Sequence, residues 1–320
     1  MPANSPWPPS ASVERQKLLA RLAHSYYLDG ESKIAIGKQT NLSRFQVAAL
    51  LQEALDCGIV RIDIAIPVDG QDSQLAGSLG IERIITVGSG SWNADPRDSA
   101  RETARVIMDE THPGDVLGIS WSRVLRTVAQ ELPPLPHNQV IQLAGALSDD
   151  EDYAPRLLAE ITCQSAWPLW APLVVENAQT LMKSPEIAQT LARADSLDVA
   201  VISIDAWNPE LSPVWKRVPR DIAEVARKLG AVAEISGHLL AADGTLIDSP
   251  VESMIVAASL HQIKNARTTV AIAFDAVRAQ AVQAAARAGL IDVLVCDESL
   301  RRELAAAPGK LEPAASATDP

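Results

Sequence analysis

Residues 31–66 read ESKIAIGKQTNLSRFQVAALLQEALDCGIVRIDIAI, and this stretch decides the architecture of the N-terminal part of the chain. Its spacing predicts a first helix over 31–40, a turn at Asn41 and Leu42, and a second helix after Ser43. Ser43 is a favoured N-cap residue, because its hydroxyl can accept a backbone N–H from the first turn of the helix. Apolar residues at helical spacing form the buried face of the second helix: Val47, Leu50, Leu51, Ala54 and Leu55.

Two helices, a tight turn and a following strand over 59–66 are typical of a winged helix-turn-helix domain. We expect Ile34, Ala35 and Ile36 to face inward from the first helix, and Gly58 to take the positive φ that often ends a helix. A helix-turn-helix domain places its second helix in the major groove of DNA. The alternative is a small helical subdomain without a DNA partner, because such subdomains produce the same short pattern.

Polar residues of this stretch predict an interface with operator DNA. Arg44 and Gln46 open the second helix, where they can read guanine and adenine respectively. Phe45 can touch a thymine methyl group or pack against the wing. The preceding helix offers side chains that can reach phosphates. The predicted DNA-binding residues are Lys33, Lys38, Gln39, Ser43, Arg44, Phe45 and Gln46.

Charge is distributed unevenly along the 320 residues. The formal net charge is −12, yet residues 1–66 contain seven Lys or Arg and six Asp or Glu, a net of +1. The acidic remainder disfavours general nucleic-acid binding, which depends on phosphate contacts. Only the N-terminal part is therefore expected to touch DNA, and tight binding would need two or more copies of it on one operator.

Cysteines and histidines give no sign of a metal site. Cys57, Cys163 and Cys296 are far apart and form neither a ligand spacing nor a disulfide framework, so we expect a reducing cytoplasm and no cofactor. The five histidines are scattered. Residues 1–12 lack the pattern of a signal peptide, and no apolar run approaches the roughly 20 residues of a membrane helix. We therefore expect a soluble cytoplasmic protein.

Beyond residue 74 the pattern alternates between strands and helices, which predicts an α/β domain with a parallel sheet and helical crossovers. The predicted strands are 83–87, 115–119, 139–143, 173–175, 197–203, 269–273 and 291–295, and a hairpin over 231–246 is expected to turn at 242–244. The predicted helices are 12–29, 72–79, 97–110, 122–132, 154–165, 185–194 and 277–287. The predicted organisation is a disordered arm over 1–12, a helix-turn-helix domain over 13–66, a linker over 67–73, an effector domain over 74–305 and a loose tail over 306–320.

Ligands of parallel sheets bind beyond the carboxyl ends of the strands. There the chain offers hydroxyls, a guanidinium, and an aromatic residue with Asp and Asn, which suit a sugar. The alternatives are local: Ser122 caps a helix with Trp121 in the core, and Asp205 caps a turn. The turn at 88–91 lacks the third glycine of a dinucleotide fingerprint. The predicted effector-binding residues are Ser120, Trp121, Ser122, Arg123, Gln142, Gly145, Asp205, Trp207, Asn208, Asp243, Phe274, Asp275 and Arg278.

Motifs along residues 14–304 resemble, in order and spacing, those of the SorC family of bacterial transcriptional regulators, also called sugar-binding, DeoR-like regulators. They are Tyr26-Tyr27, Leu42-Ser43-Arg44, Gly58-Ile59-Val60, PGDVLGISW at 113–121, VIQL at 140–143, LGAVA at 229–233, ADG at 242–244 and GLIDVLV at 289–295. The resemblance implies a winged helix-turn-helix domain joined to a Rossmann-like effector domain similar to sugar-phosphate isomerases and CoA transferases. It also implies a homodimer or homotetramer that is not an enzyme, and that controls a carbohydrate or polyol operon in response to a sugar, polyol or sugar phosphate.

Two departures from the family pattern concern the ligand. The usual Ser-Trp-Gly reads Ser120-Trp121-Ser122 here, and the usual Gly-Gly-x-x-Lys reads Phe274-Asp275-Ala-Val-Arg278. A carboxylate beside a phosphate dianion is repulsive, so we expect an unphosphorylated effector. Two alternatives stay open: an isomerase- or lactonase-like enzyme with a helical appendage, and a binding protein that has lost its effector.

Overall fold

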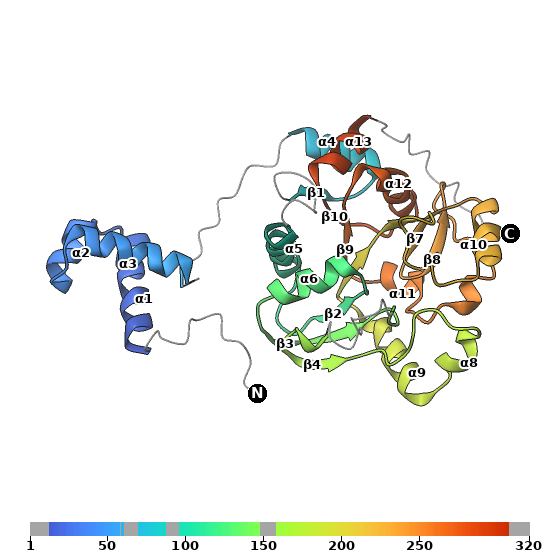
Figure 1. Cartoon of the computed structure of the whole chain (residues 1–320), viewed down its shortest axis with the longest axis horizontal. Coiled ribbons are helices and arrows are strands. Elements are labelled where there is room, and N and C mark those ends of the chain that lie inside the picture. Colours follow the sequence, from blue (N-terminus) through green and yellow to red (C-terminus); the bar gives the residue numbers. More distant parts are fainter. Residues whose placement is uncertain (1–12, 58, 61–69, 88–95, 148–157, 307–320) are drawn as a thin grey trace. The chain divides into compact units, whose positions relative to one another are not determined.

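The computed structural model describes residues 13–57, 59–60, 70–87, 96–147 and 158–306 (Figure 1). Contacts divide the chain into two compact units, residues 1–67 and 68–320, and each is described by itself. The helices are α1 Val13–Tyr27, α2 Lys33–Thr40, α3 Arg44–Asp56, α4 Gly70–Leu79, α5 Pro96–Glu110, α6 Arg123–Glu131, α8 Ala178–Met182, α9 Pro185–Ala192, α10 Arg220–Lys228, α11 Leu260–Lys264, α12 Ala279–Arg287 and α13 Glu298–Ala306, with short 3-10 turns η1 Arg193–Ser196, η2 Glu252–Met254 and η3 Ala276–Arg278. The strands are β1 Arg83–Thr86, β2 Val116–Ile119, β3 Leu135–Gln142, β4 Cys163–Trp167, β5 Val199–Ser203, β6 Asp205–Ala206, β7 Ala231–Ile235, β8 His238–Ala241, β9 Thr268–Ala273 and β10 Val293–Cys296.

The first unit is built on α1, α2 and α3, which share one small apolar core that includes Leu19, Leu22, Ile36 and Val47. The predicted buried face of α3 is confirmed, except that Leu55 is only half-buried. The prediction that Ile34 faces inward is wrong: its side chain is 56% exposed, because the short helix α2 turns Ile36 to the core instead. The wing over 61–66 and Gly58 lie outside the described residues.

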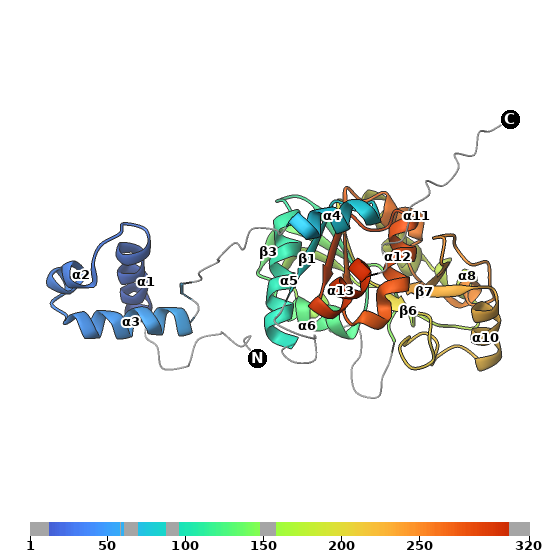
Figure 2. The ribbon, with the colours of Figure 1, turned by 90° about the horizontal axis from the view of Figure 1, so that it is seen from above.

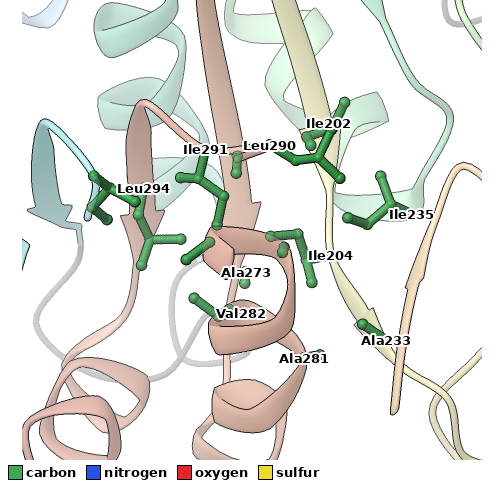
Figure 3. Close-up of a cluster of buried hydrophobic side chains, with 14 of the residues drawn as sticks. Ile202, Ile204, Ala233, Ile235, Ala273, Ala281, Val282, Leu290, Ile291 and Leu294 are labelled. Atoms are coloured by element: carbon green, nitrogen blue, oxygen red, sulfur yellow. The ribbon is translucent and has the colours of Figure 1, made fainter. Parts of the chain in front are cut away.

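The second unit contains a sheet of seven parallel strands in the order β1-β10-β9-β5-β2-β3-β4. This confirms the predicted α/β fold with helical crossovers. Its central strands are apolar on both faces, as a doubly covered parallel sheet requires; β5 is buried from Val199 to Ile202. On one face, Val199 and Val201 pack with residues of α5 and α6; on the other, Ala200 and Ile202 pack with α4, α12 and α13. Figure 3 shows side chains of this second face, with Ile204 near Val282 of α12.

A three-stranded antiparallel sheet, β6-β7-β8, packs beside the large sheet. The turn predicted at 242–244 is confirmed, because Leu240 forms an antiparallel bridge with Leu246 and Gly244 has φ of 89°. The predicted first strand of this hairpin, 231–240, is itself divided into β7 and β8 by a turn at Ser236 and Gly237, with φ of 53° and 91°. Two successive residues with positive φ form the tight turn that matches the twist of a hairpin. The turn at 242–244 follows β8 and leads the chain back to Leu246, as predicted, so the hairpin has one more turn than the sequence indicated.

Two further predictions of secondary structure differ from the structure, and several helices were missed. Residues 163–167 form strand β4 at the sheet edge, so the helix predicted over 154–165 is wrong there, and its residues 154–157 lie outside the described part. Residues 173–175 form only isolated bridges instead of a strand. Helices α8, α10, α11 and α13 were not predicted.

Candidate DNA-binding and effector-binding sites

A tight turn sets α3 against α2 in the first unit. Asn41 takes the left-handed conformation with φ of 58°, and the N–H of Leu42 donates to the carbonyl of Gly37 at 2.8 Å. A Cβ at Gly37 would lie 2.4 Å from the carbonyl oxygen of Leu42, so only glycine fits this close approach. Ser43 then starts α3 with its hydroxyl accepting the N–H of Gln46 at 3.2 Å. This is the helix-turn-helix geometry that the sequence predicts.

The start of α3 presents two large side chains to solvent. Arg44 is exposed, Phe45 is 74% exposed, and the guanidinium carbon of Arg44 lies 5.1 Å from the centre of the Phe45 ring. Lys38 of α2 is exposed beside them, and both Lys38 and Arg44 line a cavity of about 530 Å³ between the two helices. One positive face therefore joins the C-terminal end of α2 to the N-terminal end of α3.

Other predicted DNA-binding side chains have partners within the unit. The side chain of Gln46 accepts the N–H of Ser43 at 2.8 Å and so completes a capping box with it. Gln39 donates to Glu31 at 3.0 Å, and the ammonium of Lys33 lies 5.1 Å from the centre of the Tyr26 ring. Arg44, Phe45 and Lys38 are thus the predicted residues that the structure leaves most available to a ligand.

In the second unit, the order of the strands brings together three of the loops predicted to bind an effector. Strands β2, β5 and β9 are neighbours in the sheet and run in the same direction. Residues 120–123, 204–208 and 274–278 therefore follow their carboxyl ends at a single edge. The loop at 88–91, which follows β1, lies outside the described residues.

A charged pair joins two of these loops. The guanidinium of Arg278 donates to Oδ1 of Asp205 through Nε at 2.9 Å and lies within 2.8 Å of it through Nη2. Its Nη1 donates to the carbonyl of Phe274 at 2.8 Å. The two charged side chains are 20% and 17% exposed, so the solvent weakens the attraction between them only in part. Arg278 thus already has an anionic partner.

A second carboxyl lies beside this pair, and the sequence prediction missed it. Glu234 of β7 stands opposite Asp205 of β6, and its side chain accepts the N–H of Gly237 at 2.7 Å. Burial, followed by the negative charge of Asp205, raises the pKa of Glu234 to about 8. The available signal was a lone charged residue inside the apolar strand AVAEI. The adjoining turn adds Ser236, whose hydroxyl lies 2.8 Å from that of Ser120.

The loop after β9 has a strained backbone. Asp275 has φ of 84° and ψ of 130°, a region that residues with a Cβ rarely adopt at a cost of about 1–3 kcal/mol. Its N–H donates to Oδ1 of Asp297 at 3.1 Å. The Phe274 side chain is buried in the core between the sheet and α5, so the prediction that it faces an effector is wrong. It fills space that a glycine would leave.

Several predicted effector residues instead serve the fold. Gln142 is buried and bonds to the backbone of Ala144 and Leu169. Gly145 packs so closely that a Cβ would lie 2.6 Å from the carbonyl oxygen of Pro172. Trp207 is 5% exposed and packs on Trp215, so it cannot stack on a sugar ring as predicted.

The remaining loop residues divide between caps and exposed positions. Ser122 caps α6 and Trp121 packs in part against the core, as the alternative interpretation proposed. Asn208 caps a turn by accepting the N–H of Glu210 at 2.8 Å. Arg123 is exposed.

Asp243 is separated from the other predicted residues by the length of a hairpin. It follows the end of β8, whereas Ser236 and Gly237 lie at the opposite end of that strand, beside Ser120. Its carboxylate accepts the N–H and hydroxyl of Thr245 at 3.0 and 2.7 Å. The prediction that Asp243 lies with the other effector residues is therefore wrong, because its Asp-Gly turn is not the one that joins β7 to β8.

Within the described ranges, no group of three or more His, Cys, Asp or Glu side chains is arranged to hold a metal ion. Among the helices described, none is both long enough and apolar enough to cross a membrane.

Comparison with known proteins assigns the family. Residues 70–305, more than half of the chain, match the family described as "Putative sugar-binding domain". This chain belongs to the SorC-like sugar-binding family. The SorC-like chain is 24% identical over 312 residues to the transcriptional regulator LsrR of Enterobacter sp. (strain 638), which covers 93% of this chain and 95% of that protein. It is 22% identical over 308 residues to the deoxyribonucleoside regulator of Bacillus subtilis (strain 168), over 91% and 98% of the two chains.

Solved structures share the fold of the SorC-like chain. The full-length sorbitol operon regulator SorC of Klebsiella pneumoniae superimposes with a TM-score of 0.74 at 18% identity, over 90% of this chain and 98% of that one. A DeoR family transcriptional regulator from Listeria monocytogenes superimposes with a TM-score of 0.64 at 24% identity, over 73% and 98%. At these identities the likeness concerns the fold alone.

Proposed function

We propose that this chain is a DNA-binding transcriptional regulator, whose α3 reads an operator and whose second unit binds a small sugar-like effector that changes the affinity for DNA. The observation that carries the proposal is the turn between α2 and α3, which leaves Arg44, Phe45 and Lys38 exposed on one positive face of a chain that belongs to a sugar-binding family. The relatives named as transcriptional regulators, which match along nearly the whole chain, support it.

The first experiment is selection of bound fragments from the DNA of the source genome, followed by anisotropy titration at a fixed salt concentration with random DNA as competitor. We expect one or a few fragments to bind at least a hundredfold more tightly than random DNA, since specific sites usually exceed nonspecific ones by about 10³ or more. Equal affinity for every fragment would contradict the proposal. Light scattering with and without the fragment would test the homodimer or homotetramer that two half-sites require.

We propose further that the effector is an unphosphorylated sugar or polyol bound at the edge formed by residues 120–123, 205–208 and 274–278. The charge of Arg278 is matched by Asp205, and Asp275 adds a carboxylate to the same loop. At the loops after β5 and β9, a phosphate dianion would therefore meet two negative side chains and one guanidinium that already has a partner; the other cation of the edge is Arg123. Hydroxyl groups, in contrast, can donate to both carboxylates.

A thermal-shift screen tests this proposal, because a ligand that prefers the folded state raises the melting temperature. Sugars, polyols and their phosphates should be compared as matched pairs, such as sorbitol with sorbitol 6-phosphate. The proposal expects stabilisation only by unphosphorylated members. Stabilisation by phosphates alone would contradict the proposal and would indicate that Arg123 and Arg278 bind the phosphate group.

One observation favours a second function, that of an isomerase-like enzyme. A buried carboxyl with a pKa of about 8, as Glu234 has, is suited to transfer protons near neutral pH. The test is solvent deuterium incorporation into any sugar that gives a thermal shift. Exchange that is lost in Glu234→Gln would support an enzyme, and absence of exchange would leave the regulator as the sole proposal.

A further inference from the structure

A buried carboxylate connects the candidate effector loop to the helix that follows β10. Asp297 comes directly after β10 and is 1% exposed. Its Oδ1 accepts the N–H of Leu300 and the hydroxyl of Ser299, both at 3.0 Å, so it caps the N-terminus of α13. The same oxygen accepts the N–H of Asp275 at 3.1 Å. One atom thus holds both the start of α13 and the strained residue of the loop.

The other oxygen of this carboxylate has no comparable support. Oδ2 of Asp297 is buried without a hydrogen-bond partner. Because a buried polar atom without a partner is costly, the position of Asp297 depends on the three bonds to Oδ1. A change in the backbone at Asp275 therefore removes one of the few bonds that hold the start of α13.

One turn along α13, a charged contact reaches the neighbouring helix α4. Arg301 donates to both oxygens of Glu298, at 2.7 and 2.8 Å, and through Nη1 to Oδ1 of Asp72 at 3.2 Å. The side chains of Arg301 and Asp72 are 20% and 16% exposed. Figures 1 and 2 show α4, α12 and α13 side by side. In sequence, α4 is the first helix of the second unit.

We infer that Asp297 and Arg301 are positioning residues that couple the conformation of the loop 274–278 to α4, the first helix of the second unit. The route is Asp275 N–H to Asp297, along one turn of α13, and from Arg301 to Asp72. Its regulatory meaning rests on the proposed function, but the mechanical coupling does not. Ligand binding that shifts the backbone at residue 275 would move α13 and then α4.

Hydrogen exchange of the full chain tests the coupling without DNA or effector. Glycine adopts a φ of 84° without strain. The variant Asp275→Gly should therefore stabilise the loop, and amides of residues 274–278 should exchange more slowly. We expect amides of α4 to slow with them, by at least threefold. In the background of Arg301→Gln the loop should still respond, while the response of α4 should fall below 1.5-fold.

Arg302→Gln is the matched control, because Arg302 bonds to the same Glu298 at 2.7 Å but is 74% exposed and has no contact to Asp72 in the described chain. It should leave the response of α4 intact, and Asp72→Asn should reproduce the effect of Arg301→Gln. The inference would be overturned if amide exchange in α4 did not change in Asp275→Gly, or if it changed by the same factor in the background of Arg301→Gln. Failure of operator selection with intact exchange coupling would refute the proposed function and leave the coupling standing.

Discussion

Arg278 and Asp205 form a contact in which two nitrogens of the guanidinium approach one carboxylate oxygen, at 2.9 and 2.8 Å. The contact bridges the loops after β9 and β5, which come together only in the folded sheet. It neutralises the positive charge of Arg278 before any ligand binds. A ligand that needs the full positive charge must displace Asp205 and leave a partly buried carboxylate without its partner, which is unfavourable.

Removing the charge of Asp205 should therefore open the site to anions. We expect that 10 mM inorganic phosphate will not stabilise the wild-type protein, and that it will raise the melting temperature of Asp205→Asn by about 2–4 °C, equivalent to roughly 1 kcal/mol in a unit of this size. Differential scanning fluorimetry measures both. Asp243→Asn is the control, since that carboxylate lies at the other end of β8. A phosphate response in wild type would show that Asp205 does not occupy Arg278 in solution.

The two exposed cations of the first unit should differ in what they read. Arg44→Ala should weaken binding to the selected operator by about 1–3 kcal/mol while changing the affinity for random DNA little, because Arg44 opens the helix that can enter the groove. Lys38→Ala should weaken both kinds of DNA alike and reduce the salt dependence by about one contact. Anisotropy titrations at several salt concentrations distinguish the two. Equal losses on both DNAs for Arg44→Ala would remove that residue from base recognition.

The alternation of strands and helices could be predicted because the central strands carry continuous apolar runs such as VAVI at 199–202, which only a doubly covered sheet buries. The edge strand β4 could not, since it alternates between half-buried and exposed positions and follows a helix-like sequence. Helix α10 could have been found from Pro219 and the spacing of Ile222, Ala223 and Ala226. The turn at 242–244 could be predicted from Asp243-Gly244, whereas the turn at Ser236-Gly237, which divides the predicted strand into β7 and β8, was missed.

The candidate site was less predictable than the fold, because the sequence does not say which way a loop side chain points. The edge itself follows from the strand order, and Asp205 and Arg278 do meet there. Trp207 and Phe274, which suit a sugar by type, are instead buried in the core. Glu234 reaches the edge only through the antiparallel pairing of β7 with β6, a long-range contact that local patterns do not encode.

Gly37 should be the position where the first unit tolerates least change. Gly37→Ala places a Cβ 2.4 Å from the carbonyl oxygen of Leu42, so the turn between α2 and α3 must shift. We expect a loss of about 1–3 kcal/mol in the free energy of unfolding of this unit. Gly77→Ala in α4 is the matched control: nothing lies within 4 Å of its Cβ, and alanine should stabilise that helix by about 0.5–1 kcal/mol. Circular dichroism during urea unfolding measures both, and a neutral Gly37→Ala would contradict the close approach.

Glu234 should make the second unit less stable as the pH rises. Burial and the charge of Asp205 raise its pKa from 4.5 to about 8, so between these values the folded state holds a proton that the unfolded state has lost. The contribution of Glu234 to stability is therefore greatest below about pH 4.5, falls by at most about 1.4 kcal/mol per pH unit, and levels off above about pH 8. Glu234→Gln keeps an oxygen for the N–H of Gly237 and cannot ionise, so urea unfolding at pH 5.5, 6.5 and 7.5 should show its stability rising relative to wild type. Glu210→Gln, on an exposed carboxylate, should follow the wild type at every pH. If the curve for Glu234→Gln ran parallel to the wild-type curve, Glu234 would be ionised in the folded protein. The assignment of a protonated carboxyl beside Asp205 would then be wrong.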